Sequence, residues 1–194
     1  MSYFAQSETE VILASASPRR QELLHSLFES FSVEAACVEE IPDPALSAEQ
    51  QPEYLAGLKC AAVAALHPDA LVIGADTGVF IDGRMIGKPK SREDGLAMLE
   101  ALSGREHQVI TGCALQQGSR RMSFSECTRV RFFPLSKEEL EAYLELGEYA
   151  DKAGAYGIQG AGRLLVEGIE GDYYNVMGLP VARLARAIGA FQEE

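Results

Sequence analysis

Tryptophan is absent from this sequence of 194 residues, histidine occurs three times and cysteine four times. So few histidines argue against a catalytic metal centre built from several imidazole groups. No segment approaches the roughly 20 apolar residues of a membrane-spanning helix, so we expect no membrane partner. The cysteines form no C-x-x-C pair, which favours reduced thiols over a zinc site or a disulfide framework; they are Cys37, Cys60, Cys113 and Cys127.

The first ten residues also lack the features of a secretory signal. Met1 to Glu10 is polar and acidic, with neither a basic segment nor an apolar core, and we therefore expect a cytoplasmic protein. Acidic residues outnumber basic ones by 29 to 17, which gives a net charge of −12. Such a charge repels polyanions, so nucleic acid is not an expected partner, and a local cluster of basic side chains stands out.

Repeats, low-complexity tracts and long flexible linkers are missing too, while hydrophobic residues make up 47% of the sequence. This amount of apolar material is sufficient for a packed core. We therefore predict one domain over residues 1–194, with two lobes around a cleft.

Hydrophobic patterns and capping signals predict a mixture of strands and helices. The continuous apolar run Ala70–Ala75 is typical of a central strand covered on both faces, and Asp82-Gly83 between two apolar segments predicts a tight hairpin. Other strands are expected at residues 11–14, 31–38 and 164–169 and on both sides of Gly118-Ser119, and helices from residue 18, over 52–66, 91–104, 136–146 and 180–191. Hairpins and crossovers together indicate an α/β fold with a mixed sheet.

The segment Ser15 to Arg20 places two arginines in the first turn of a helix, with Ser17 as the expected N-cap and Pro18 as the first helical residue. The helix dipole opposes each arginine by about 0.3–1 kcal/mol, so these side chains either extend into solvent or bind an anion. Backbone N–H groups, serine hydroxyls and guanidinium groups suit phosphate oxygens. Ser17, Arg19 and Arg20 are therefore candidate phosphate ligands.

A second candidate site is Gly74-Ala75-Asp76-Thr77, at the end of the predicted central strand. Open α/β sheets bind ligands at such strand ends, although Asp76 could simply terminate its strand. With Asp82-Gly83 as a two-residue turn, Thr77 lies opposite Lys88 across the hairpin. A carboxylate, a hydroxyl and a lysine then lie at one end of the hairpin, as a metal–phosphate site requires.

The acidic pair Glu39-Glu40 follows the second predicted strand. Solvated surface is the common location of such a pair, but carboxylate oxygens are also the ligands that Mg²⁺ and Mn²⁺ prefer. Proteins often supply only one or two of them beside the phosphates of a substrate. Glu40 is therefore a candidate metal ligand.

The glycine-rich segment Asp151–Gly160 does not follow G-x-G-x-x-G, and no G-x-x-x-x-G-K-[ST] motif occurs in the chain. Neither a Rossmann nucleotide site nor a P-loop is predicted. The segment is either a flexible connection or a loop whose backbone approaches a flat base, with Tyr156 for stacking and Gln159 for hydrogen bonds. We expect no direct chemical role for His107, which is as well explained as a strand residue.

Taken together, these segments resemble the Maf family of nucleotide pyrophosphatases. The resemblance extends from residue 10 to residue 190 and is carried, in this order, by residues 14–20, 74–77, Lys88-Pro89, Ser103-Gly104 with His107 and Thr111, residues 151–160 and Gly178-Leu179-Pro180. It implies an extended mixed sheet with flanking helices and two lobes around a central nucleotide cleft, as in inosine-triphosphate pyrophosphatases. It also implies a divalent metal cofactor (Mg²⁺ or Mn²⁺), a cytoplasmic location and a homodimer.

The resemblance further implies a substrate class. The aspartate that matches Asp76 is taken as the proton acceptor, and the positions that match Arg19, Thr77 and Gln159 distinguish substrates by base. Their identities here are similar to those of the branch that acts on dTTP and UTP. The expected reaction is hydrolysis of a nucleoside triphosphate to a monophosphate and pyrophosphate.

The expected mechanism is metal-assisted attack of water on the α-phosphorus. Glu40 holds the metal, Arg19, Arg20 and Lys88 hold phosphate oxygens, and Asp76 orients and deprotonates the water. In related sequences an acidic residue often precedes the lysine that matches Lys59. Leu58 stands there in this chain, which argues against carrying over a phosphate contact to Lys59.

Two other classes of function remain open at this point. A nucleotide-binding regulator of cell division would keep the arginines without turnover, and an RNA-binding protein would use the same basic groups on a longer polyanion. The presence of Asp76, Glu40 and Lys88 argues against the first class, and the net charge of −12 argues against the second.

Overall fold

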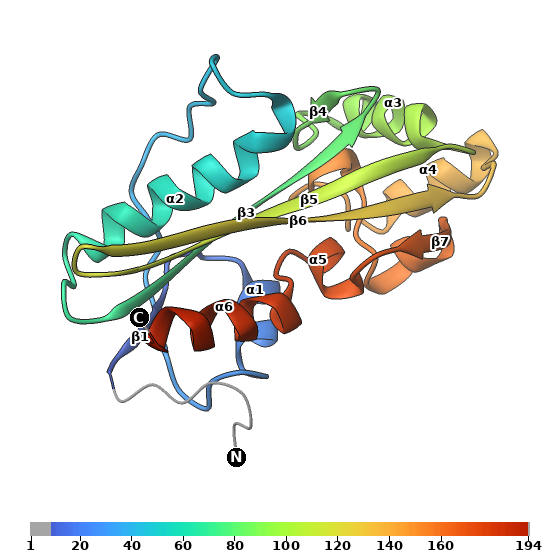
Figure 1. Ribbon diagram of the computed structural model, residues 1–194. Helices are drawn as coiled ribbons and strands as arrows, with labels where there is room; N and C mark the ends of the chain where they lie inside the picture. The colour runs from blue at the N-terminus through green and yellow to red at the C-terminus, as the bar shows by residue number, and fades with distance from the viewer. Residues whose placement is uncertain (1–8, 194) are drawn as a thin grey trace. The chain divides into compact units, whose positions relative to one another are not determined.

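A computed structural model describes residues 9–193 (Figure 1). Most of the segment Met1–Glu10, in which we expect no signal peptide, lies outside the described residues. The strands are β1 (Val11–Leu13), β2 (Ser32–Val33), β3 (Leu71–Ile81), β4 (Arg84–Ile86), β5 (Glu106–Gln117), β6 (Arg120–Phe132) and β7 (Val166–Glu170). The α-helices are α1 (Pro18–Leu24), α2 (Gln51–Ala64), α3 (Arg92–Leu102), α4 (Lys137–Glu145), α5 (Tyr173–Met177) and α6 (Val181–Glu193), and the 3₁₀ segments are η1 (Ala48–Gln50), η2 (Ala153–Ala155) and η3 (Gly160–Leu164).

The described strands form one sheet in the order β2-β1-β3-β5-β6-β7, with β4 paired to β3. β1 is parallel to β2 and β3, whereas the β3–β4 and β6–β7 pairs are antiparallel. β1 and the first half of β3 are buried along their whole length, as expected for parallel strands with helices on both faces. The predicted α/β fold with a mixed sheet is confirmed.

Local signals account for most element boundaries. Asp82 and Gly83 have φ angles of 51° and 72°, as a tight primed hairpin turn requires, and Ile81 pairs with Arg84. Ser136 forms the predicted capping box at the start of α4. The strand expected at residues 31–38 is wrong in length, because β2 contains only two exposed residues and pairs with β1 alone.

The chain divides into two compact units. Unit 1 contains the chain up to Asp76, Thr111–Glu126 and the chain from Gly178 onward, and unit 2 contains Thr77–Ile110 and Cys127–Met177. The division falls within β3, β5 and β6, so each of these strands contributes residues to both units. Each unit has its own buried apolar core.

In unit 1, α2 lies on one face of the sheet and α1 and α6 lie on the other (Figure 1). The backbone of α2 approaches the sheet closely because two strand residues are glycines. A Cβ atom on Gly74 would lie 2.4 Å from the carbonyl oxygen of Ala56, and one on Gly112 would lie 2.2 Å from the amide nitrogen of Glu53. This close approach places the residues of α2 directly beside the end of unit 1's part of β3.

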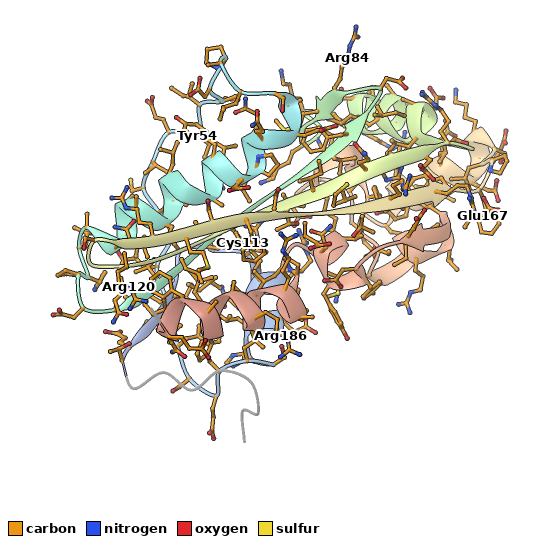
Figure 2. The ribbon with its side chains drawn as sticks, viewed as in Figure 1. Tyr54, Arg84, Cys113, Arg120, Glu167 and Arg186 are labelled. Carbon is orange, nitrogen blue, oxygen red and sulfur yellow. The ribbon has the colours of Figure 1, made fainter. Side chains whose placement is uncertain are left out.

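Two arginines fix α6 to β6. Arg120 lies at the start of β6 (Figure 2). Its guanidinium group donates to the carbonyl of Phe191 and lies over the Phe191 ring. Arg183 of α6 donates to the carbonyl of Ser125 at 2.6 Å and to the carboxylate of Glu126 at 2.7 Å. Arg183 therefore satisfies a backbone carbonyl of β6 and attaches α6 to this strand.

In unit 2, α3 and α4 pack with strand residues around Phe132, which is fully buried. The same core includes Val79 of β3 and Tyr156 of the glycine-rich segment. No helix within residues 9–193 is long and apolar enough to cross a membrane.

Candidate functional site

Three charged side chains meet at the end of unit 1's part of β3. The ammonium group of Lys59 donates to Asp76 Oδ1 at 2.7 Å and lies 2.8 Å from Glu40 Oε2. The side chains of Lys59 and Asp76 are only 12% and 15% exposed, whereas that of Glu40 is 55% exposed. Two carboxylates therefore converge on one ammonium group, and the exposed carboxylate of Glu40 is the one with room to move.

Lys59 is the residue of this cluster that sequence reasoning missed. On α2 it follows Leu55 and precedes Val63 by four residues each, so it shares a side of the helix with two core positions. A lysine near the apolar side of a helix needs a partner when it is buried, because an unpaired buried charge is costly. The position of Lys59 on the apolar side of α2 therefore indicates a carboxylate close to this helix, and it is the feature of the sequence that could have identified Lys59.

Leu58, the departure from the usual family pattern, lies in a different environment. It lines a groove of about 500 Å³ together with Tyr54 of α2 and Met122 of β6. The acidic residue that the family resemblance implies at this position would therefore lie in that groove. Lys59 is not among the residues that line this groove. Leu58 and Lys59 therefore lie in different surroundings, and the identity of residue 58 does not bear on the contacts of Lys59.

Arg20 lies at the start of α1 and is half-buried. Its Nε donates to the carbonyl of Gly178 at 2.9 Å, and its Nη1 donates to Ser15 Oγ at 3.2 Å. Burial lowers the pKa of Arg20, while the nearby charge of Asp76 acts in the opposite direction. Because an arginine remains protonated in proteins, Arg20 keeps a positive charge close to Asp76 and also connects α1 to the Gly178-Leu179-Pro180 segment.

The predicted start of α1 is confirmed, with Ser17 as the N-cap and Pro18 as the first residue, but the side chain of Ser17 makes no capping hydrogen bond. Its backbone N–H donates to Ser15 Oγ at 3.3 Å. Arg19 is half-buried and its charge lowers the pKa of Arg20. Because α1 has only seven residues, its dipole is short, and the two guanidinium groups are the main source of positive charge here.

The donor set at Glu40 and Asp76 suits a hard divalent cation. Among residues 9–193, no three histidine, cysteine, aspartate or glutamate side chains gather as a metal site. Mg²⁺ is nevertheless often bound through one or two carboxylates while substrate phosphates and water complete its shell. The two oxygens that face Lys59 Nζ form such a pair, and they already neutralise one positive charge.

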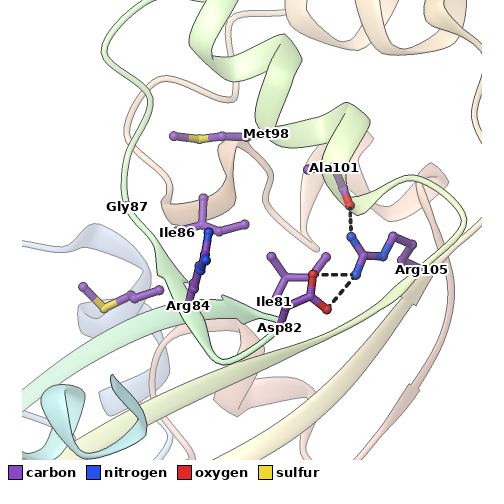
Figure 3. Close-up of a pocket in the computed structure, with 9 residues that line it drawn as sticks. Ile81, Asp82, Arg84, Ile86, Gly87, Met98, Ala101 and Arg105 are labelled. Carbon is purple, nitrogen blue, oxygen red and sulfur yellow. Dashed lines mark hydrogen bonds and ion pairs between the residues drawn. The ribbon is translucent and has the colours of Figure 1, made fainter. Parts of the chain in front are cut away.

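In unit 2, the β3–β4 hairpin leads into the segment that carries Lys88. Its strand pairing ends at Val79 and Ile86, two residues short of the predicted pair of Thr77 with Lys88. The turn is held by Arg105, whose Nη2 lies 2.7 and 2.8 Å from the two carboxylate oxygens of Asp82 (Figure 3). Asp82, Arg84 and Arg105 are among the residues that line a hollow of about 640 Å³. The side chain of Arg84 points away from the ribbon (Figure 2).

The glycine-rich segment is ordered by its own contacts in unit 2. Tyr156 is 5% exposed and packs against Phe132, so the predicted stacking of a base on Tyr156 is wrong. Gln159 is half-buried and lines a hollow of about 620 Å³, together with Arg163, Ile169 and Tyr173. An aromatic ring, an amide and a guanidinium group thus share one hollow with apolar side chains.

The candidate residues are divided between the two units. Unit 1 holds Ser17, Arg19, Arg20, Glu40 and Asp76 and brings the last two together on Lys59. Thr77, Lys88 and Gln159 belong to unit 2. Asp76 and Thr77 are consecutive residues of β3, so the strand itself joins the two groups.

A family model described as Maf-like protein matches residues 10–191. The chain belongs to the Maf-like protein family. A dTTP/UTP pyrophosphatase of Bacillus velezensis is 51% identical over 181 residues, which cover 93% of this chain and 96% of the relative. A dTTP/UTP pyrophosphatase of Symbiobacterium thermophilum is 48% identical over 182 residues, with 94% of each chain covered.

Solved structures extend the likeness at the level of the fold. A HAM1 protein from Coxiella burnetii superposes with a TM-score of 0.50 at 11% identity, over 94% of this chain and 99% of the other. At this identity the likeness concerns the fold alone. The family resemblance found in the sequence is therefore confirmed by the match of the Maf-like family model and by relatives that are aligned over nearly their full length.

Proposed function

We propose that this protein hydrolyses dTTP and UTP to the nucleoside monophosphate and pyrophosphate. The observation that carries this proposal is the ammonium group of Lys59 held between Asp76 and Glu40, in a chain half identical to a dTTP/UTP pyrophosphatase. The cluster combines two carboxylates with the nearby positive charge of Arg20. Carboxylates and fixed cations are the groups that a metal-assisted reaction of a triphosphate needs.

In the proposed reaction, Arg19, Arg20 and Ser17 bind phosphate oxygens in unit 1. Arg20 is held in position because Gly178 and Ser15 accept hydrogen bonds from it. A guanidinium group held in this way presents its charge with little loss of conformational entropy. The same proposal assigns Lys88 and Thr77 to the triphosphate from unit 2.

Asp76 acts as the proton acceptor of the proposed reaction. Its buried carboxylate is oriented by Lys59, which leaves an oxygen to take the proton of the attacking water. Glu40 and Asp76 would hold a divalent cation, which neutralises charge on the leaving pyrophosphate when it is bound. With a cation bound there, the cation would orient Asp76 in place of Lys59, and the flexible four-carbon stem of Lys59 would allow its ammonium group to reach phosphate oxygens.

Gln159 reads the base in this proposal. Uracil and thymine present carbonyl acceptors beside an N–H donor, and a glutamine amide offers both a donor and an acceptor. The hollow that Gln159 lines falls in the size range of small-molecule sites and includes the ring of Tyr173. A wrong base would leave polar groups unpaired, which discriminates more strongly than size alone.

The proposal also covers the setting of the reaction. Residues 1–194 act as one catalytic domain, since β3, β5 and β6 each contribute to both units. The protein works in the cytoplasm as a homodimer, as the family resemblance implies, with a nucleoside triphosphate as its partner and without nucleic acid or membrane partners. The net charge of −12 supports the exclusion of polyanions.

A nucleotide panel tests the proposed function. The protein is incubated with dTTP, UTP, CTP, ATP and GTP, with Mg²⁺ or Mn²⁺ or with a chelator, and the products are identified by chromatography. We expect pyrophosphate and monophosphate from dTTP and UTP, and no turnover with the chelator. Orthophosphate with a diphosphate product contradicts attack at the α-phosphorus, and binding without turnover favours a regulator.

A further inference from the structure

A buried hydrogen bond connects the glycine-rich segment to β5. The hydroxyl group of Tyr156 lies 2.7 Å from His107 Nε2, and the two residues are 5% and 2% exposed. Their rings and that of Phe132 meet edge to face, with centroids 4.7 to 5.4 Å apart. These ring contacts and the burial of both residues therefore restrict the orientation of the two polar groups.

No other polar group competes for the ring of His107. Its Nδ1 is buried and has no hydrogen-bond partner among the described residues. Burial also lowers the pKa of His107 to about 4, so the ring is neutral at neutral pH. Tyr156 is thus the polar partner that sets the orientation of this ring, and the pair is used for nothing else in the proposed reaction.

The segment next to Tyr156 adopts a conformation that the sequence alone does not favour. Gly154 and Ala155 have φ angles of 71° and 60°, and Ala155 is fully buried. Alanine rarely enters the left-handed region, and such residues persist where the surrounding structure holds them. The N–H of Gly154 donates to the carbonyl of Gly87 at 3.0 Å, which joins the segment to the residue before Lys88.

The other side of the segment is held as well. The N–H of Gly157 donates to the hydroxyl oxygen of Tyr143 at 3.3 Å, and the N–H of Ala161 donates to the carboxylate of Glu148 at 3.1 Å. Gln159 lies between these two attached residues. Its backbone therefore takes its position from bonds to α4 and to the residues that follow it, and from the burial of Tyr156.

We propose that His107 and Tyr156 are positioning residues that hold Gly154–Ala161 in place and so set the orientation of Gln159. This inference rests on the proposed function, in which Gln159 reads the base. Neither residue contacts the nucleotide in this scheme. Loss of the hydroxyl of Tyr156 leaves His107 Nε2 without its partner and releases a strained segment, so it affects selection of the base more than the chemical step.

Tyr156→Phe tests this inference because it removes one hydroxyl and keeps the packed ring. We expect the preference for UTP over CTP, measured as the ratio of kcat/KM values, to fall roughly tenfold, as one lost buried hydrogen bond allows. The change should lie in KM for UTP, with kcat nearly unchanged. Hydrogen exchange of the amides from Gly157 to Ala161 should become faster.

Tyr149→Phe is the matched control. Tyr149 is a half-buried tyrosine of the same unit, and no hydrogen bond joins its hydroxyl to another described residue. We expect this variant to keep the wild-type base preference and exchange rates. If Tyr156→Phe fails to fold, His107→Phe replaces it, since it removes the partner of the Tyr156 hydroxyl and keeps an aromatic ring, and the same changes are expected.

Gln159→Glu separates the two levels of inference. If it leaves the base preference unchanged, the role of Gln159 in the proposed function is refuted, whatever Tyr156→Phe does. If Gln159→Glu changes the preference and Tyr156→Phe does not, Gln159 remains the base reader and the positioning role is refuted. An equal fall of kcat for UTP and CTP in Tyr156→Phe, with their ratio unchanged, also refutes it, because it marks a general structural defect.

Discussion

The candidate groups of the two units are held by different kinds of interaction. In unit 1, Lys59, Asp76 and Glu40 are joined by ion pairs. In unit 2, Tyr156 and Tyr143 hold the glycine-rich segment through neutral hydrogen bonds, and the Glu148 carboxylate accepts a further hydrogen bond from its backbone. Charge attraction acts over distance and tolerates a mobile side chain such as that of Glu40, whereas a donor and acceptor that read a base require fixed directions. In the proposed function, the ion pairs of unit 1 therefore serve the phosphates, together with Lys88 and Thr77 of unit 2, and the fixed glycine-rich segment of unit 2 serves the base.

Asp76→Asn gives the sharpest test of unit 1. A general base contributes roughly 10²- to 10⁴-fold to the rate, so we expect turnover of every nucleotide to fall by about this factor. The amide keeps an oxygen for Lys59, so the fold should persist and nucleotide binding should remain measurable. Steady-state kinetics and the melting temperature check both expectations.

Asp82→Asn is the control for this change. Asp82 is an exposed aspartate of unit 2 that is paired with Arg105, and we expect nearly wild-type turnover from its variant. If Asp76→Asn also retains a wild-type rate, Asp76 only terminates its part of β3. A loss that differs strongly between UTP and CTP contradicts the division of roles between the units.

The sequence predicted the elements because their signals are local. Ser136 and Glu139 cap a helix within one turn, and Asp82-Gly83 fixes its own hairpin register. The lengths of β5 and β6 were not predictable in this way, since pairing across the sheet determines where such strands end. β2 is shorter than its β-prone sequence predicts, because it lies at the edge of the sheet and pairs only with the short strand β1.

The candidate site was predictable in part, for a related reason. Asp76 and Glu40 were chosen by residue type and position, and the structure brings both onto one cation. Lys59 was missed because its partners are distant in the sequence and its neighbour Leu58 belongs to another groove. Tyr156 was assigned to a base because an aromatic in a glycine-rich segment looks exposed, whereas its burial depends on His107 and Phe132.

The buried His107 of unit 2 predicts how the stability of the protein depends on pH. Burial lowers the pKa of His107 from 6.5 to about 4, so between these values the unfolded chain binds a proton that the folded chain does not. Stability therefore rises with pH in this window and is lost as pH falls toward 4, by up to about 3 kcal/mol from this group. Urea unfolding of the wild type and of His107→Phe, at pH values from 7 to 4, measures this contribution.

The variant should lose less stability on acidification than the wild type, whatever its stability at pH 7. His25→Phe is the control, since His25 is an exposed histidine of unit 1 and its variant should follow the wild-type curve. Parallel curves for the wild type and His107→Phe contradict a buried neutral imidazole. They would also weaken the contrast between the units, because His107 would then be solvated like a surface group.

The smallest effect is expected from Arg20→Lys, which tests whether the charged groups of unit 1 also stabilise the fold. Arg20→Lys keeps a positive charge but loses the planar group that donates to Gly178 and Ser15. We expect its unfolding free energy to fall by about 1–3 kcal/mol, as for loss of partly buried hydrogen bonds. Nucleotide binding, measured by calorimetry, should fall much less in Arg20→Lys than in Arg20→Ala, which loses the charge as well. Arg186→Ala, at an exposed arginine of α6, should change neither quantity. If Arg20→Lys keeps wild-type stability, the contact with Gly178 does not stabilise the fold and Arg20 serves the phosphates alone. If Arg20→Lys binds nucleotide as poorly as Arg20→Ala, phosphate binding depends on the planar guanidinium group. Unit 1 then needs directional contacts, as unit 2 does.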